Sequence, residues 1–445
     1  MSYTMNNTTK AFRGEILHFL SDPAKDETNS YQHFADGVLV VKNGLVEQIG
    51  DAQDILPNLA DDVEITVHDN GLLMPGFVDT HIHFPQTEII GSYGEQLLEW
   101  LDTYTFPTEA QFGDKDFALP RAQFFLDQLL QNGTTTALVF GTVHPESVDA
   151  FFERAEKMNL RMICGKVMMD RNAPDNLTDT AQSSYDESKA LIEKWHGKGR
   201  LHYAVTPRFA PTSTSEQLHK AGDLLKEYPD VFMHTHLSEN ENECAWVKEL
   251  FPECENYLDV YDKHGLLSKR SVFAHGIHLC DSEYQRLSDT ESSLSYCPTS
   301  NLFLGSGLFN LKKAEAYNVD VGLGTDVGGG TSFSQLQTLN EAYKIQQLRG
   351  EKLTALKSFF LATLGGAQAL DLDSKIGNFE TGKEADFVAL DYQSTDLMRV
   401  RMNKSKDLLE RLFVMTTLGD DRAIKATYVM GEQMHDRDAP KPSAL

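Results

Sequence analysis

Two histidine pairs in the sequence have a spacing that suits a metal site. His81 and His83 are separated by one residue, and His234 and His236 repeat that spacing. In an extended strand, residues i and i+2 point to the same face, so each pair can direct two imidazoles to one point. In the second pair we favour His236 as the ligand, because it is the outer residue and opens His236-Leu237-Ser238-Glu239.

A carboxylate and a further histidine complete the candidate metal site. Asp326 ends a later apolar run, in Gly324-Thr325-Asp326. Three imidazoles and one carboxylate match a catalytic zinc site that keeps one position open for water. The candidate metal ligands are His81, His83, His236 and Asp326. We favour His275 over His278 as a neighbouring group, and whether His275 ligates the metal or only hydrogen-bonds the water stays open. Zinc and ferrous iron both accept such ligands.

Other residues with chemical potential fit structural positions better. The histidines outside the motifs, which we interpret as ordinary core or surface residues, are His144, His196, His202, His219 and His264. Cys297 precedes Pro298 and has no general base in its motif, so it indicates a turn and not a nucleophile. Gly328 to Gly330 lack the lysine of a phosphate-binding loop and are interpreted as flexible backbone beside the substrate.

Eight short apolar runs, with helical patterns between them, must position these side chains. They span residues 77–83, 135–140, 162–169, 201–207, 231–237, 271–279, 293–298 and 319–326. One helical stretch carries Phe124, Leu126, Leu129 and Leu130 at helical spacing before Gly133 as a stop. Eight strands with helical crossovers predict an α/β fold of the (β/α)8 TIM-barrel type, whose active sites form at the carboxyl ends of the strands. A doubly wound sheet competes, but no G-x-G-x-x-G turn supports it.

The two ends of the chain differ from this middle. Val63–Asp69, Ala385–Asp391 and Ala423–Met434 read as strands, and Lys42-Asn43-Gly44 marks a hairpin. Isolated hairpins are marginal in water, so we expect both ends to pair. The sequence therefore predicts a small β-sandwich domain from residues 1–70 and 376–445, around a catalytic barrel of residues 71–375.

Composition excludes several classes of partner. The 445 residues include 40 basic and 66 acidic side chains, a formal net charge of −26. Binding to phosphate needs a basic field, so we expect neither a nucleic acid nor a membrane as partner. No apolar run reaches 18 residues, so we expect no transmembrane helix. The first 19 residues lack the layout of a signal peptide, and the five cysteines form no C-x-x-C pair, so we expect a cytoplasmic protein with reduced thiols.

The first histidine motif carries a family resemblance. Pro75-Gly76-Phe77-Val78-Asp79-Thr80-His81-Ile82-His83 resembles the opening motif of the amidohydrolase superfamily, and His236, His275 and Asp326 follow in the order that the superfamily uses. Binuclear members place a carboxylated lysine after the fourth barrel strand. Here that strand ends in Thr206–Ala210 without a lysine, and Lys166 lies on the wrong strand. The resemblance therefore implies the mononuclear deaminase branch, which carries His-x-x-Glu as in His236 to Glu239.

The chemistry of such a deaminase suits these residues. A metal lowers the pKa of its bound water to about 7. Glu239 is the candidate proton shuttle to the ring nitrogen. Asp326 can accept the proton of the attacking water, and His275 can hydrogen-bond the hydroxide. The predicted catalytic residues are therefore Glu239, Asp326 and His275.

Segments beside the motifs narrow the substrate. Residues 84–101, 105–109 and 206–211 resemble the branch of the superfamily that acts on guanine. The resemblance implies deamination of guanine to xanthine and ammonia, one zinc ion per chain and a homodimer. It also implies substrate contacts by His83, Phe84, Pro85, Gln86, Arg208, Phe209, His236, Glu239 and Asp326. The physics agrees, because a guanidinium such as that of Arg208 can donate to adjacent O6 and N7 acceptors.

Two alternatives stay open at this point. The first is a related mononuclear amidohydrolase that deaminates or dechlorinates another ring, such as a triazine, cytosine or an adenosine-type base. The second is a binding or scaffold protein with the same fold and no metal. That alternative would require that some of the metal-ligating residues be missing, whereas all of them are present in the sequence.

Overall fold

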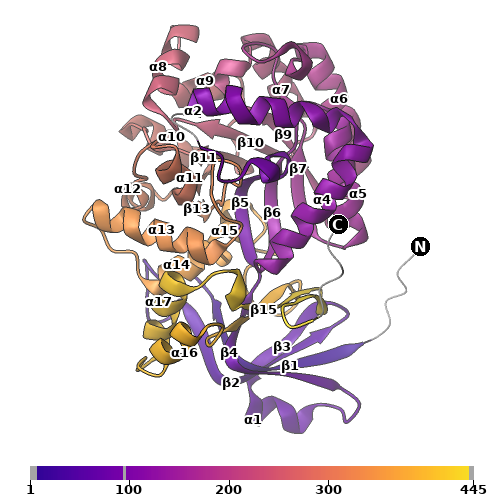
Figure 1. The fold of residues 1–445 in the computed structure, drawn as a ribbon, viewed down its shortest axis with the longest axis vertical. Helices are drawn as coiled ribbons and strands as arrows, with labels where there is room; N and C mark the ends of the chain where they lie inside the picture. The colour runs from indigo at the N-terminus through magenta and orange to yellow at the C-terminus, as the bar shows by residue number, and fades with distance from the viewer. Residues whose placement is uncertain (1–7, 94–96, 440–445) are drawn as a thin grey trace.

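The computed structural model describes residues 8–93 and 97–439, and it shows a large α/β body above a smaller β domain (Figure 1). The strands of the large body coincide with the eight predicted runs. They are β5 (Phe77–His83), β6 (Thr134–Phe140), β7 (Arg161–Gly165), β8 (Val167–Met168), β9 (His202–Pro207), β10 (Phe232–Leu237), β11 (Ser271–His275), β12 (Ser293–Tyr296) and β13 (Val321–Leu323). The third predicted run is divided into β7 and β8.

These strands form a parallel barrel. Their order is β13-β12-β11-β10-β9-β7-β6-β5, with β8 paired to β9, and every pairing is parallel. The ends of the sheet meet where the backbone N–H of Asp326, just after β13, donates to the carbonyl of His81 on β5 at 2.9 Å. Gly322 allows this approach, because a Cβ there would lie 2.2 Å from Thr80 Cγ2. The predicted (β/α)8 architecture is confirmed.

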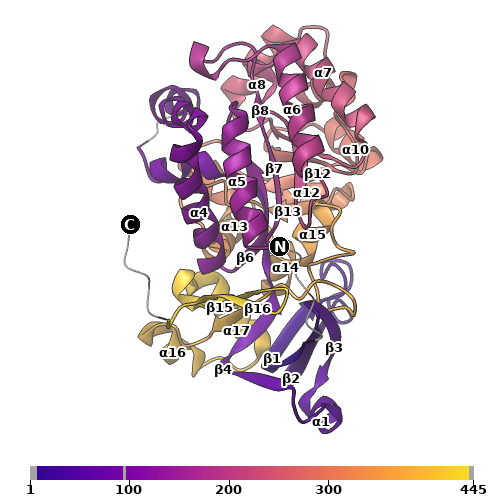
Figure 2. The same cartoon turned by 90° about the vertical axis from the view of Figure 1, so that its right-hand side faces the viewer.

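Helices surround the barrel, and Figure 2 shows α4, α5 and α6 over β6 and β7. The longer helices are α4 (Lys115–Gln131), α5 (Pro145–Lys157), α6 (Ala181–Trp195), α7 (Ser215–Glu227), α8 (Glu241–Leu250), α9 (Tyr257–Lys263), α10 (Asp281–Asp289), α13 (Gln335–Leu348), α14 (Ala355–Leu361), α16 (Asp396–Met402) and α17 (Leu408–Leu418). The shorter ones are α1 (Ala52–Ile55), α2 (Leu97–Trp100), α3 (Phe106–Glu109), α11 (Pro298–Phe303), α12 (Leu311–Ala316) and α15 (Leu364–Ala369). Over the described ranges, no helix is long and apolar enough to cross a membrane.

The predicted helix before Gly133 is present, with one correction to its buried face. α4 ends at Gln131, and Gly133 has the left-handed φ of +78° that favours glycine at a helix stop. Leu126, Leu129 and Leu130 are buried as expected. Phe124, however, is 44% exposed, because the buried face of the helix runs through Phe125 instead.

The small domain is built from both ends of the chain, as predicted. Its strands are β1 (Thr9–Phe19), β2 (Tyr31–Lys42), β3 (Leu45–Asp51), β4 (Glu64–Pro75), β14 (Phe387–Asp391), β15 (Ile424–Val429) and β16 (Glu432–Asp436). They pair in the order β16-β15-β14-β4-β1-β2-β3. The apolar residues of both halves share one core, in which Phe12 packs edge to face on Phe387 and Tyr428. Asn43 and Gly44 form the predicted hairpin turn, with positive φ at both.

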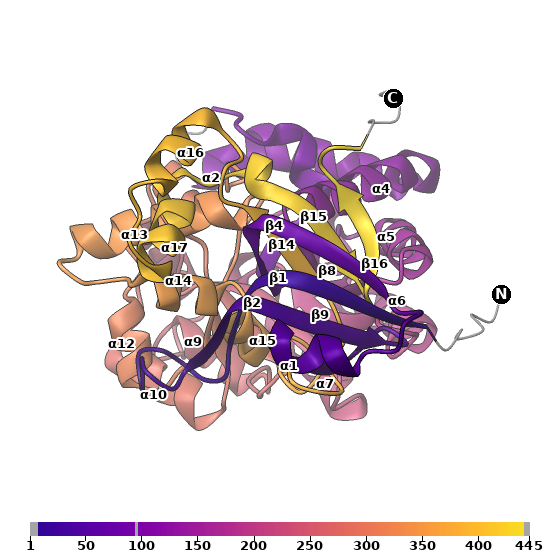
Figure 3. The same ribbon diagram turned by 90° about the horizontal axis from the view of Figure 1, so that it is seen from below.

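This sheet lies across the end of the barrel where the strands begin, as the view from below shows (Figure 3). The chain passes directly from β4 into β5 at Gly76. The functional end of the barrel is therefore the opposite one. The predicted domain boundary at residue 70 falls within β4. The predicted division, with residues 1–70 and 376–445 in the small domain and residues 71–375 in the barrel, therefore stays a prediction.

A buried ion network joins the two domains. Arg161 and Arg200, at the start of barrel strands, both donate to Glu384, and Arg200 also donates to Asp386. The four side chains are between 2% and 11% exposed. Burial alone would raise the pKa of Glu384, but hydrogen bonds from Arg161 and the charge of Arg200 lower it. Glu384 is therefore ionised and compensates two buried guanidinium groups.

Replacing Glu384 with alanine is expected to lower the free energy of unfolding by about 3–5 kcal/mol, because it leaves buried charge uncompensated. The shift of the urea unfolding midpoint measures this loss. Glu47→Ala is the control: Glu47 pairs with Lys42 at 3.0 Å, but both side chains are more than 40% exposed. Such a pair contributes about 1 kcal/mol or less. Equal midpoints for the two variants would contradict a role for the network.

Candidate active site

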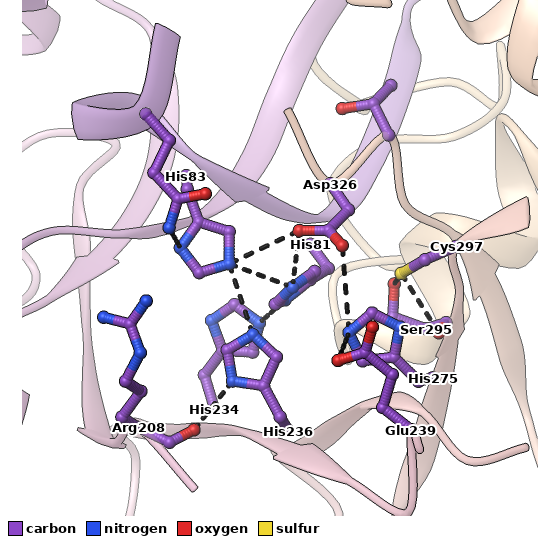
Figure 4. A network of polar contacts seen from close by, with 12 residues as sticks. His81, His83, Arg208, His234, His236, Glu239, His275, Ser295, Cys297 and Asp326 are labelled. Atoms are coloured by element: carbon purple, nitrogen blue, oxygen red, sulfur yellow. Dashed lines mark hydrogen bonds and ion pairs between the residues drawn. The ribbon is translucent and has the colours of Figure 1, made fainter. Parts of the chain in front are cut away.

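The predicted metal ligands converge at the carboxyl end of the barrel (Figure 4). His83 Nε2 lies 3.3 Å from His81 Nε2 and 3.2 Å from His236 Nε2. Asp326 Oδ1 lies 3.2 Å from His81 Nε2 and 3.4 Å from His83 Nε2. These atoms come from β5, from β10 and from the loop after β13. Alternation along β5 directs His81 and His83 to the same side, as the sequence predicted.

The separations between these neighbouring atoms suit ligands of one metal ion. Zinc binds imidazole nitrogen and carboxylate oxygen at about 2.0–2.2 Å, so neighbouring ligand atoms lie about 3.3–3.6 Å apart. The four separations given above run from 3.2 to 3.4 Å, at or just below the short end of that range. A second grouping, of His81, His275, Cys297 and Asp326, also brings its ligand atoms within 4.8 Å of one another. Burial raises the pKa of the Cys297 thiol well above its usual range, so it stays protonated and is a poor ligand or nucleophile.

The imidazoles are held neutral and oriented. Burial lowers the pKa of His81, His83 and His236 far below the usual range, which leaves a lone pair for a metal. His236 Nδ1 donates to the backbone carbonyl of Arg208 at 2.7 Å, so its Nε2 faces the cluster. His81 Nδ1 lies 2.8 Å from Nε2 of His234. The inner histidine of the second pair therefore supports a ligand, as is usual around metal sites.

Glu239 and His275 lie on one side of the cluster in Figure 4. Glu239 Oε1 accepts a hydrogen bond from Ser306 Oγ at 3.1 Å, and Oε2 lies 3.4 Å from His275 Nε2. Burial, reinforced by the charge of Asp326, raises the pKa of Glu239 to about 8. His275 Nδ1 donates to the amide oxygen of Asn301 at 2.9 Å, which turns Nε2 toward Glu239 and Asp326. Glu239 can therefore hold a proton beside the cluster at neutral pH.

The backbone positions two of these groups in an uncommon conformation. His275 and Asp326 have φ values of +73° and +51°, in the left-handed region that non-glycine residues rarely adopt. Such residues cost about 1–3 kcal/mol each and persist where the surrounding structure holds them. Asp79 supplies part of that hold, because its carboxylate accepts hydrogen bonds from the backbone of His81 and from Thr325.

A pocket opens beside the cluster and brings most of the predicted substrate residues together. It is lined by His83, Gln86, Leu97, Trp100, Leu101, Arg208, Phe209, His236, Glu239, Leu304, Asp326 and Gly329. Arg208 follows β9 and lies opposite Glu239 across the imidazoles in Figure 4. Gln86 belongs to the 3-10 helix Phe84–Ile89, directly after β5. The pocket thus combines the cluster, a proton-holding carboxyl group and a guanidinium.

Phe84 and Pro85 are the exceptions among the predicted substrate residues. Phe84 is buried on the outer side of the barrel wall. The centroid of its ring lies 5.2 Å from that of Phe112 and 5.5 Å from that of Phe151. Pro85 lines a separate surface pocket beside Arg121. The helical turn after His83 rotates these two residues away from the cluster and Gln86 toward it. Phe84 and Pro85 thus do not line the pocket beside the cluster, and their contact with the substrate stays a prediction that this lining does not support.

The sequence analysis gave no role to two residues of this wall. Trp100 lines the pocket, and its indole Nε1 is buried without a hydrogen-bond partner among residues 8–93 and 97–439. Glu109 is fully buried behind Arg208 and Gln86. Trp100 ends α2 and Glu109 ends α3, on either side of a π-helix (Leu101–Thr105), and no simple periodicity marks the buried face there. Gly94, Glu95 and Gln96 of the same motif lie outside the described residues.

The residues interpreted as structural have partners elsewhere. Lys166 pairs with Asp179 at 2.6 Å and with Glu187 at 3.2 Å. His278 lies 2.9 Å from the carbonyl of Ser306 and does not line the pocket. The histidines expected to be ordinary do not line it either; they are His144, His196, His202, His219 and His264.

The fold and site together define a class of protein. A barrel with two His-x-His strands, an aspartate after its last strand and a composite β domain is the arrangement of metal-dependent hydrolases of the amidohydrolase family. The model of that family matches residues 72–434. The chain belongs to the amidohydrolase family.

Relatives within the family point to a narrower group. The guanine deaminase of Escherichia coli strain K12 is 55% identical over 434 residues, which cover 97% of this chain and 99% of that protein. The solved structure of the E. coli guanine deaminase superposes with a TM-score of 0.95, over 96% of this chain and all of that one. A guanine deaminase structure from C. acetobutylicum, with guanine bound in its active site, is 30% identical with a TM-score of 0.87 and covers 96% and 100% of the two chains.

Proposed function

We propose that this chain is a guanine deaminase, which hydrolyses guanine to xanthine and ammonia in purine metabolism. The observation that carries the proposal is one pocket in which a metal-binding cluster, the Glu239 carboxyl group and the Arg208 guanidinium face a common space. Its likeness to guanine deaminases over nearly the whole chain supports the same substrate. The direct test is ammonia release from guanine, with adenine, cytosine and guanosine as comparisons.

The residues divide the chemistry between them. A bound zinc ion, held by His81, His83, His236 and Asp326, would supply a water with a pKa lowered to about 7. Asp326 would accept the proton of the attacking water. Glu239 holds a proton on its carboxyl group, which it would deliver to the ring nitrogen beside the attacked carbon. The proton that Asp326 took from water would then pass to the leaving amine, and Glu239 would regain a proton from the added hydroxyl group as the ring carbonyl forms.

His275 and Phe209 would assist at the edges of the pocket. His275 would hydrogen-bond the attacking oxygen through Nε2, which makes no hydrogen bond within the part of the chain that the structure describes. Phe209 is 4% exposed and lines the pocket, where it would contact the face of the purine.

Neither alternative from the sequence is favoured. A deaminase or dechlorinating hydrolase for another ring finds no support from the relative at 55% identity, which is a guanine deaminase. A metal-free scaffold would lack ligands, whereas here His83 Nε2 lies 3.2–3.4 Å from donor atoms of His81, His236 and Asp326, which supports a metal site. As finer points we propose one zinc ion per chain, a homodimer and a cytoplasmic location.

Arg208→Ala should lower kcat/KM for guanine strongly and leave the bound metal unchanged. Guanine has an O6 acceptor where adenine has an amine donor, and a guanidinium can donate only to the former. Sites that hydrogen-bond a substrate reject an analogue by about 10⁴–10⁵ in favourable cases. The ratio of kcat/KM for guanine to that for adenine, measured in wild type and variant, is therefore expected to fall.

Arg208→Lys is the matched control, because it keeps the charge without the planar fork and should restore activity only partly. An unchanged ratio in Arg208→Ala with the metal still bound would show that another residue reads the base.

A further inference from the structure

The buried carboxylate of Glu109 accepts hydrogen bonds from both residues that we expect to face the polar edge of the purine. Glu109 is fully buried, and Arg208 and Gln86 are each 2% exposed. Glu109 Oε2 accepts a hydrogen bond from Arg208 Nη1 at 2.8 Å, and its Oε1 accepts one from Gln86 Nε2 at 3.0 Å. Glu109 does not line the pocket itself. It therefore acts through its two neighbours.

The first contact sets the orientation of the Gln86 amide. A carboxylate only accepts hydrogen bonds, so the amide nitrogen must face Glu109. The amide oxygen then lies on the opposite side, next to Gly328, where an added Cβ would approach it to 2.0 Å. Gln86 Nε2 also lies 3.1 Å from His83 Nδ1. A neutral His83 whose Nε2 lone pair faces the cluster carries its proton on Nδ1, which would favour the amide oxygen. Without the carboxylate, the amide could therefore turn over and exchange donor for acceptor. Glu109 thus fixes the hydrogen-bonding polarity that Gln86 offers.

The second contact sets the charge of the pocket wall. The guanidinium and the carboxylate form an ion pair at 2.8 Å, away from solvent. Within the described residues, Nη1 is the guanidinium nitrogen with a protein partner, so further N–H groups are left for a ligand. Because the charge is already compensated, these groups recognise a neutral acceptor without favouring an anion.

We propose that Glu109 is a positioning residue that determines specificity: it pairs with Arg208 and orients Gln86, so that the pocket selects a neutral purine over an anionic one. The inference rests on the proposed function, in which neutral guanine enters. The product xanthine has a second ring carbonyl in place of the amine and is therefore the stronger acid. A wall without net charge would retain the xanthine anion less than a bare guanidinium would.

Glu109→Gln tests the inference because it removes the charge and nearly keeps the shape. Breaking a buried charge pair is expected to lower kcat/KM for guanine by about 10²-fold. The specific measurement is calorimetric binding of xanthine and hypoxanthine at mildly alkaline pH, where xanthine is largely an anion and hypoxanthine largely neutral. The affinity for xanthine relative to hypoxanthine should rise by about tenfold in the variant, because Arg208 is then unpaired.

Two further variants separate this role from structural damage. Asp179→Asn breaks another buried ion pair, with Lys166 at 2.6 Å, outside the pocket, and should leave the xanthine-to-hypoxanthine ratio unchanged. Glu109→Asp keeps the charge but is too short to reach both partners, so it should lower kcat/KM and preserve the ratio. This variant keeps the test decisive if Glu109→Gln does not fold.

The inference would be overturned if Glu109→Gln lost affinity for xanthine and for hypoxanthine equally. A wild-type kcat/KM for guanine in Glu109→Asp would also overturn it. Wild-type protein that releases no ammonia from guanine would instead overturn the proposed function, and the binding data for the two oxopurines would still judge Glu109.

Discussion

A His81→Ala variant is expected to purify without its metal ion and without measurable deaminase activity. His81 Nε2 lies 3.3 Å from His83 Nε2 and 3.2 Å from Asp326 Oδ1, so its removal opens one corner of the donor set. The remaining groups cannot complete four-coordinate binding. Elemental analysis of the purified chain, together with ammonia release from guanine, measures both losses.

His278→Ala is the matched control for that variant. His278 follows β11 near His275, but its ring contacts the carbonyl of Ser306 and stays outside the pocket. Wild-type protein should carry one ion per chain, and so should the control. Two ions per chain would contradict the mononuclear assignment. Full metal content in His81→Ala would contradict the assignment of His81 as a ligand.

Glu239→Gln should retain the metal and lose turnover. An amide cannot carry the proton that the buried carboxyl group holds, and general acid–base groups contribute about 10²–10⁴-fold to rate. Metal should stay bound, because the carboxylate contacts Ser306 and His275 and not the four donor atoms. The measurement is kcat for guanine in protein of verified metal content.

Glu88→Gln makes the same chemical change at an exposed residue that pairs with Arg121, and it should leave kcat unchanged. If Glu239→Gln with bound metal turned over guanine at the wild-type rate, Glu239 would be a structural residue of the turn before α8.

Local patterns in the sequence determined the barrel and the centre of the site. Each barrel strand is a short apolar run bounded by turn residues, and the period of two along β5 places His81 and His83 on one face without knowledge of their neighbours. Because parallel strands end at the same rim of a barrel, the later ligands His236 and Asp326 could be assigned from their places at strand ends. The hairpin at Asn43 likewise needed only its own residues.

The tertiary structure alone decided the contacts made by irregular segments and by residues far apart in the chain. Glu109 meets Arg208 across 99 positions, and Arg200 meets Asp386 across 186. The direction of Phe84 depends on the helical turn after β5; Pro85 favours the start of such a turn, but it does not determine which side chain faces the cluster. Strand alternation fixes the face of a side chain, whereas a buried ion pair is fixed by two backbones brought together by packing. Sequence spacing therefore located the candidate metal ligands, and only the folded chain showed which charge compensates Arg208.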